Sequence, residues 1–183
     1  MKTEVQTAIV LLVVIILTRT LLHVAPNVEF VTGAGISAGL LFKNKRLAFA
    51  VIAAGMIITD LVIGNSIIFV FTWSGFLLAP LLGLLTAKKA GNGTAPVLAL
   101  NGTAAGVIST LLFFLWTNLG VVLTTNMYSR DLSGLLQSYL NALPFLKNQL
   151  GANLLLVPLL ILAVNYTLKL HHGFKVAPHH NSL

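Results

Sequence analysis

The stretch PNVEFVTGAGISAGLLF, residues 26–42, follows the first apolar run of the chain. Small side chains fill its middle, and one carboxylate, Glu29, stands near its start. Small residues let two helix backbones approach closely, which is typical of helices packed against one another in membranes. The stretch therefore predicts a short helical span with close neighbours. It also raises the question of why an acid is kept at its beginning.

The composition of the whole chain is that of an integral membrane protein. Of its 183 residues, 57% are hydrophobic and 8% are charged, whereas soluble domains carry about 25% charged residues. The net charge is +7. Most of the charges stand near the ends of apolar runs, which favours a role in membrane orientation over binding of nucleic acid. The chain has no cysteines, so disulfides and thiolate metal sites are excluded.

Six apolar runs are candidates for helices that cross a bilayer, which takes about 20 residues each. They lack the alternation expected of a β-barrel. We therefore expect an all-α integral membrane protein with six transmembrane helices. It would form a single domain over residues 1–170, followed by a disordered cytoplasmic tail over 171–183. The predicted spans cover residues 7–24, 28–42 (a short one), 47–63, 67–87, 97–123 and 148–168.

Basic residues alternate from one connection to the next. The turn KNKR at 43–46 follows the second run, and Lys88 and Lys89 follow the fourth. The connections after the first and third runs carry no Lys or Arg. Basic connections stay in the cytoplasm, so both termini are predicted inside. A cleaved signal peptide is the alternative for the first run, although HVA at 23–25 is a poor cleavage site.

The last outer connection, residues 124–147, is predicted to contain an amphipathic helix. Apolar residues recur there at three- and four-residue spacing, the period of a helix with one apolar face. Asp131 or Ser129 stands where it can cap the start, and Pro144 is expected to end the helix. We expect the helix at the outer interface, either as a lid over the bundle or as an ordinary interfacial helix.

Three ionisable residues are predicted at similar depth, in the outer third of the membrane. Arg19 lies late in the first run, Glu29 early in the second and Asp60 late in the third. Ionisable residues inside a membrane mark functional sites by default. The structural alternatives are a carboxylate favoured by a helix N-terminus and an ion pair with Arg19. We expect Arg19 to serve one carboxylate, which leaves the other for a ligand in a pocket that also includes Thr32, Asn65, Trp73 and Asn118.

Small residues recur in the fourth run at Gly75, Ala79 and Gly83. Such a face packs against another helix of the same chain or docks a second membrane subunit. The chain has no GxxxxGK[ST] loop and no HExxH motif, and its GxSxG match, GISAG at 35–39, follows no predicted strand, so neither ATP hydrolysis nor an enzyme is expected. No cofactor or metal is expected, and the histidines of the tail are interpreted as solvated.

Several segments carry a resemblance to a known class of transporter subunit. PNVEFVT, the KNKR turn and LAFAVIAAGMIITDLVIGN resemble the substrate-binding S component of energy-coupling-factor transporters. LLFFLWTNLGVVL and SGLLQSYLNALPFLKNQLGANLLL resemble a family of prokaryotic membrane proteins related to S components. The resemblance implies a cell-membrane protein with a vitamin or similar micronutrient bound near the outer face. It also implies a transmembrane coupling subunit and two cytoplasmic ATPases as partners.

By position, the resemblance adds Tyr128 to the predicted pocket. The first run reads AIVLLVVIILTRT and lacks the Ala-x-x-x-Ala face with which S components commonly meet the coupling subunit. The sequence thus predicts a solute-binding subunit of an uptake transporter. The alternative is a ligand-free structural or assembly protein of the membrane, which has no need of a polar outer cavity.

Overall fold

The structure, a computed structural model, describes residues 2–22, 25–64, 66–91 and 93–173, with side chains as far as Leu170. Five of the helices in this part of the chain, all except α2, are long and apolar enough to cross a membrane. The prediction of an all-α chain with six helices is confirmed, and five of these helices are candidate membrane spans; that all six cross the membrane stays a prediction. The helices are α1 (Lys2–Thr20), α2 (Val31–Leu41), α3 (Lys45–Ile63), α4 (Phe69–Ala90), α5 (Ala95–Thr124) and α6 (Leu132–Gly173).

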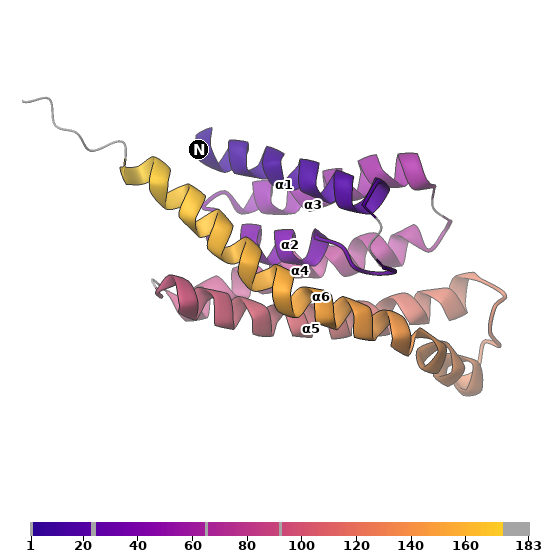
Figure 1. Ribbon diagram of the computed structural model, residues 1–183. Helices are drawn as coiled ribbons and strands as arrows, with labels where there is room; N and C mark the ends of the chain where they lie inside the picture. Colours follow the sequence, from indigo (N-terminus) through magenta and orange to yellow (C-terminus); the bar gives the residue numbers. More distant parts are fainter. Residues whose placement is uncertain (1, 23–24, 65, 92, 174–183) are drawn as a thin grey trace, which may run out of the picture.

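The helices run up and down in one bundle (Figure 1). The start of α1 and the end of α6 lie at the same end of the bundle, here the termini end. The KNKR turn between α2 and α3 lies there too, as does the end of α4 with Lys88 and Lys89. The connections after α1, α3 and α5 lie at the opposite end, here the pocket end.

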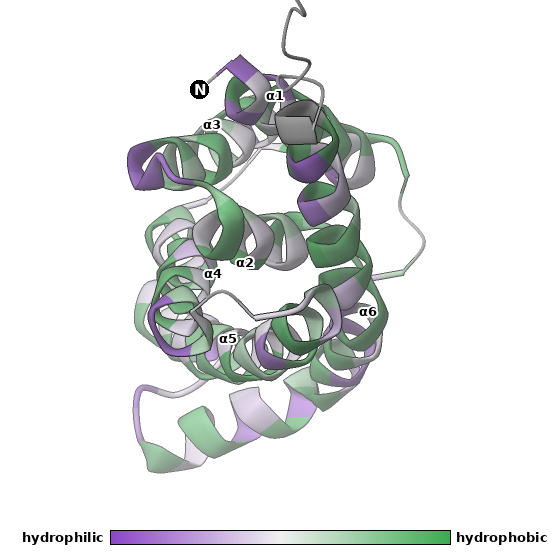
Figure 2. Ribbon diagram, turned by 90° about the vertical axis from the view of Figure 1, so that its left-hand side faces the viewer, coloured by the Kyte–Doolittle hydropathy of each residue, from purple (hydrophilic) through white to green (hydrophobic). Residues whose placement is uncertain are grey.

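Helix α2 stands at the centre of the bundle, enclosed by the other helices (Figure 2). Every residue of α2 except Leu41 is buried. Its 11 residues rise about 16 Å, roughly half of the 30 Å hydrocarbon core of a bilayer. The helix begins at Val31, inside the predicted span 28–42, because residues 28–30 are not helical. Glu29 therefore lies on a non-helical segment that leads into the buried helix.

The small residues of α4 pack inside this chain. A Cβ on Gly35 of α2 would lie 2.8 Å from the Cβ of Ala79. Gly83 faces the backbone of Ile36 in α2, and Gly75 faces α5. Gly75, Ala79 and Gly83 are all buried. The alternative that this face docks a second subunit is wrong, because α2 and α5 already cover it.

The predicted outer amphipathic helix and the predicted sixth span form a single helix, α6. The prediction that Pro144 ends the first of them is wrong, since the helix continues through it. A proline inside a helix removes one backbone hydrogen bond and bends the helix. In Figures 1 and 2, the first part of α6 lies at an angle to the rest. The disordered tail was predicted to begin at residue 171, but α6 continues to Gly173. Residues 174–183 lie outside the described part of the chain.

A buried carboxylate that the sequence analysis did not single out fixes the turn between α2 and α3. Glu4, only 7% exposed, accepts hydrogen bonds from the backbone N–H groups of Lys43 (2.8 Å) and Asn44 (3.3 Å). The Nζ of Lys45 donates to the carbonyl of Gly39 at 2.9 Å. These bonds satisfy backbone groups where α2 ends. They tie the start of α1 to the turn.

Candidate functional site

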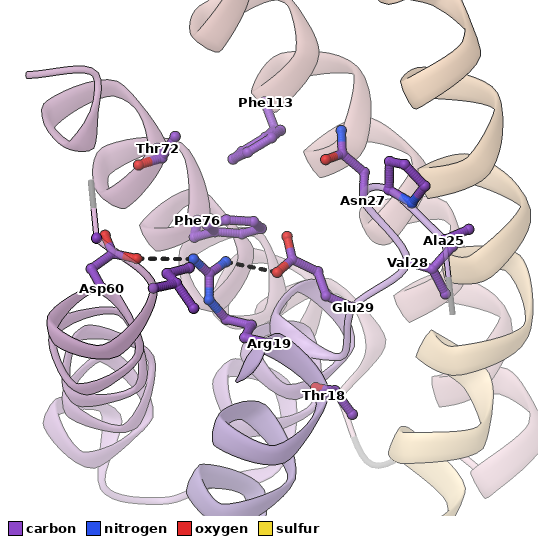
Figure 3. A pocket seen from close by; sticks show the side chains of 13 residues that line it. Thr18, Arg19, Ala25, Asn27, Val28, Glu29, Asp60, Thr72, Phe76 and Phe113 are labelled. Atoms are coloured by element: carbon purple, nitrogen blue, oxygen red, sulfur yellow. Dashed lines mark hydrogen bonds and ion pairs between the residues drawn. The ribbon is translucent and has the colours of Figure 1, made fainter. Parts of the chain in front are cut away.

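Arg19, in the last turn of α1, joins three elements at the pocket end. Its Nη1 lies 2.7 Å from Oε2 of Glu29, and its Nη2 lies 3.0 Å from Oδ1 of Asp60 in α3 (Figure 3). Its Nε donates to the hydroxyl of Thr59 at 2.9 Å. The expectation that Arg19 serves one carboxylate is wrong, because a guanidinium presents five donors on different edges and reaches both.

Asp60 is held from a second side by an aromatic residue of α4. The indole Nε1 of Trp73 donates to Oδ2 of Asp60 at 2.6 Å. The guanidinium of Arg19 also lies over the ring of Phe76, 5.7 Å from its centre. The side chains of Arg19 and Asp60 are 11% and 6% exposed, and that of Glu29 is 15% exposed. This cluster is therefore a desolvated network that connects α1, α3 and α4.

A cavity of about 560 Å³ lies above the cluster, here the charged pocket. Its rim is formed by exposed residues such as Pro26 and Gly64, and its floor by Arg19, Glu29 and Asp60. The floor holds two carboxylates and one guanidinium. Oε1 of Glu29 makes no hydrogen bond with the described residues, and Figure 3 shows it turned away from Arg19. This oxygen is the exposed acceptor of the charged pocket.

A second cavity of about 330 Å³ adjoins the first, here the neutral pocket. Both pockets are lined by Asn27, Thr72 and Phe113, so they adjoin each other. Asn27 has a positive φ of 61°, a backbone conformation that asparagine tolerates better than most residues. The turn at Asn27 places the non-helical segment before α2 between the two pockets.

The neutral pocket is lined by α5, by the connection after it and by the first part of α6. Among the described residues, none that lines it is charged. Asn118 is engaged on both sides, because its Nδ2 donates to the carbonyl of Phe114 (2.8 Å) and its Oδ1 accepts from Ser138 (3.3 Å). The hydroxyl of Tyr128 accepts from Nδ2 of Asn141 at 3.3 Å. The first part of α6 thus forms a wall of this pocket.

Gln149 lines the neutral pocket from α6 and is only 2% exposed. Its Nε2 is buried and has no hydrogen-bond partner. Sequence reasoning missed this residue, although an amide within the predicted sixth span was a visible signal. Buried polar groups are normally hydrogen-bonded, so this amide is the exception in the site.

The predicted site residues separate into two groups. Arg19, Glu29 and Asp60 meet in the charged pocket, and Asn118 and Tyr128 line the neutral pocket. Trp73 donates a hydrogen bond to Asp60 and lines neither pocket. Thr32 is buried in α2 and also lines neither pocket. Asn65 lies outside the described residues. That any of these side chains binds a solute stays a prediction.

The fold and these cavities define an all-α membrane protein with a two-part polar site at one end of its helical bundle. The chain belongs to a family of unknown function, DUF6580, whose model matches residues 1–174. Comparisons with curated proteins and with solved structures find no match to this chain. The resemblance to transporter S components remains a prediction from the sequence.

Proposed function

We propose that this protein is the solute-binding membrane subunit of an uptake transporter and captures a vitamin or similar micronutrient from the outer face of a prokaryotic cell membrane. The charged pocket carries the proposal. It is a cavity of about 560 Å³ with buried charges, at one end of a mainly apolar bundle. Ligand pockets of about 300–1,000 Å³ with a few convergent polar groups are the usual form of small-molecule sites.

The distribution of basic residues supports an outward-facing pocket. The KNKR turn, Lys88 and Lys89 stand at the termini end, opposite the pockets. Basic segments next to spans stay in the cytoplasm. The termini end is therefore assigned to the inside and the pocket end to the outside. Reporter fusions in the connections after α3 and α4 should report outside and inside, respectively.

The floor of the charged pocket favours one kind of solute group. Two carboxylates face one guanidinium, and Oε1 of Glu29 keeps acceptor capacity. A positive group or a strong hydrogen-bond donor complements this oxygen. A hydrogen bond to a charged group contributes about 1.5–3 kcal/mol, so the loss of this contact would weaken binding roughly tenfold to a hundredfold.

Energised uptake requires partners in this proposal. The chain carries no GxxxxGK[ST] loop, so nucleotide hydrolysis would come from cytoplasmic ATPases through a transmembrane coupling subunit. The small residues of α2 and α4 are buried within the bundle. A coupling subunit would therefore meet another surface of the protein.

One observation favours the alternative of a ligand-free structural or assembly protein. Arg19 bonds both Glu29 and Asp60, and Trp73 completes the coordination of Asp60. A buried ion cluster of this kind is able to hold three helices together without any ligand. The cavity above the cluster distinguishes the two functions, because helix pairing alone does not require it.

Native mass spectrometry of the full chain, purified in a mild detergent, tests the proposal. We expect a co-purified small molecule on the wild-type protein and a strongly reduced share of it on Glu29→Gln. Arg130→Gln, at an exposed position outside both pockets, is the matched control and should retain the molecule. If only lipid and detergent are bound in all three proteins, the structural alternative is favoured.

A further inference from the structure

We propose that the solute of the charged pocket is an organic monocation, whose positive group meets Glu29 and whose apolar body lies along Phe113. This inference rests on the proposed function and names the substrate class of the same site. Two kinds of group complement Oε1 of Glu29, a positive charge and a neutral hydrogen-bond donor. The charge balance of the pocket, its other polar groups and its aromatic wall all favour the positive charge.

The first support is the charge balance. The chain has 11 Lys and Arg residues and only four Asp and Glu residues, yet two of those four meet one guanidinium in this pocket. Among the described residues that line the cavity, no other is charged. With both carboxylates ionised, its floor therefore carries an excess of one negative charge. A buried charge without a counter-charge is costly. A neutral donor would leave this excess in place, whereas a monocation would cancel it.

The second support is the direction in which the hydroxyl groups of the lining donate. Thr18 donates to the carbonyl of Val14 at 2.8 Å, and Thr72 donates to that of Phe69 at 3.2 Å. Neither hydroxyl has a proton left for a solute, so each can only accept. Arg19 directs donors at both carboxylates of the floor. A lining that mainly accepts hydrogen bonds favours a cationic solute over an anionic one.

The third support is the aromatic wall. Phe76 and Phe113 both line the cavity, and their ring centres lie 4.3 Å apart. Aromatic rings attract cations over their faces and also cover apolar surface. One face of Phe76 already holds the guanidinium of Arg19, at 5.7 Å. Phe113 is therefore the ring that is left for the body of a ligand bound at Glu29 (Figure 3).

The size and the ligands of the pocket favour an organic cation over a metal ion. Its volume of about 560 Å³ is in the range of small-molecule sites. Ions such as Mg²⁺ and Ca²⁺ take about six or more oxygen ligands, and the guanidinium of Arg19, bonded to both carboxylates, would repel such an ion. An ammonium or a protonated ring nitrogen needs only one strong acceptor, which Oε1 of Glu29 supplies.

Three probes that share one benzene ring test the charge of the solute. Benzylamine is an ammonium at neutral pH, benzyl alcohol is a neutral donor, and benzoate is an anion. Their binding to the full chain in detergent is measured by ligand-observed NMR titration, with detergent alone as the baseline. We expect benzylamine to bind the wild-type protein at least roughly tenfold more tightly than benzyl alcohol, as for a hydrogen bond to a charged group. Benzoate should bind most weakly.

Variants of Glu29 assign this preference to one carboxylate. Glu29→Gln should weaken the binding of benzylamine roughly tenfold to a hundredfold and leave that of benzyl alcohol nearly unchanged, which also reports that the variant is folded. Glu29→Asp keeps the charge and should keep the preference for benzylamine. Glu4→Gln is the matched control, because it makes the same substitution in a buried carboxylate at the termini end. It should leave all three affinities unchanged.

Equal binding of benzylamine and benzyl alcohol to the wild-type protein would refute the assignment, as would benzylamine binding that Glu29→Gln leaves intact. If no probe binds, the molecule that co-purifies in native mass spectrometry decides. A cation supports the assignment, whereas a neutral or anionic solute refutes it and leaves the proposed function standing. If no probe binds and no solute co-purifies, the proposed function itself fails.

Discussion

The charged pocket and the neutral pocket adjoin each other but differ in how their polar groups are satisfied. In the charged pocket, Arg19 bonds Glu29 and Asp60, and Asp60 also accepts from Trp73. In the neutral pocket, the amide of Asn118 is bonded on both sides, whereas Nε2 of Gln149 has no partner. The charges are thus largely explained by one another. The amide nitrogen of Gln149 is not explained by a partner in this way.

This difference changes what each pocket says about function. A buried ion cluster that satisfies itself has a sufficient structural reason to exist. Nε2 of Gln149 is a buried donor without a partner, and Oδ1 of Asn153, one turn further along α6, is a buried acceptor without one. The two pockets thus bear on the proposed function through different observations. The charged pocket contributes through its volume and through the exposed oxygen of Glu29.

The largest expected effect is that of removing Arg19. Arg19→Met leaves two carboxylates in a desolvated site without their cation. Breaking a buried ion pair in this way costs about 3–5 kcal/mol. Thermal unfolding in detergent should show a large loss of stability, with Arg130→Met as the exposed control. Equal unfolding temperatures for the two variants would mean that the cluster is not structural and would remove the contrast between the pockets.

A smaller and graded effect should separate the two carboxylates. Asp60 has both oxygens engaged, by Arg19 at 3.0 Å and by Trp73 at 2.6 Å, whereas Glu29 is engaged through Oε2 alone. Asp60→Asn should lower the free energy of unfolding by about 1.5–3 kcal/mol, the range for hydrogen bonds to charged groups. Glu29→Gln should lower it less and act mainly on solute binding. The reverse order in unfolding measurements would assign Glu29 the structural role.

The sequence predicted the helices well because apolar runs and basic turns are local signals. The basic KNKR turn lies at one end of the bundle, and the connections after α1 and α3, in which the sequence has no Lys or Arg, lie at the other. The length of α2 and the continuity of α6 were harder to predict. Whether a chain enters a bundle as helix or as a non-helical segment depends on neighbours, as at residues 28–30. Whether Pro144 ends or bends a helix depends on what packs around it.

The sequence predicted which charged residues meet in the charged pocket, but not which of them form ion pairs. Depth along the spans brought Arg19, Glu29 and Asp60 together correctly. Distances alone decide that one guanidinium reaches both carboxylates, and no sequence pattern encodes them. Gln149 was overlooked because an uncharged amide is a weaker signal in a span than a charge. Its importance follows from a missing partner, which only the structure shows.

Gln149 allows a test in which two amides of the neutral pocket should respond in opposite directions. If Nε2 is unpaired in the ligand-free protein, Gln149→Leu should leave stability unchanged or raise it by up to about 1–3 kcal/mol, the cost of an unsatisfied buried group. Asn118→Leu, in the same pocket, removes an amide with partners and should be destabilising. Unfolding of both variants without ligand gives the comparison. A loss as large for Gln149→Leu as for Asn118→Leu would mean that Gln149 has a structural partner.

The smallest expected effect is that of acid on the start of α6, which forms a wall of the neutral pocket. Asp131 caps α6, because its Oδ1 accepts from the backbone N–H of Gly134 at 2.8 Å and from the hydroxyl of Ser129 at 2.9 Å. These bonds hold the pKa of Asp131 below its ordinary value of 3.8. A carboxyl with a lowered pKa in the folded state contributes stability above that ordinary value and loses the contribution as the pH falls further. The protection of the Gly134 amide against hydrogen exchange, measured relative to its intrinsic exchange rate at each pH, should therefore fall on acidification, and this fall should disappear in Asp131→Asn. Because the effect is confined to the start of α6, acid should loosen the wall that carries Ser138 while the buried cluster at Arg19 keeps its protection. Simultaneous loosening at both places would show that the two pockets open as one unit.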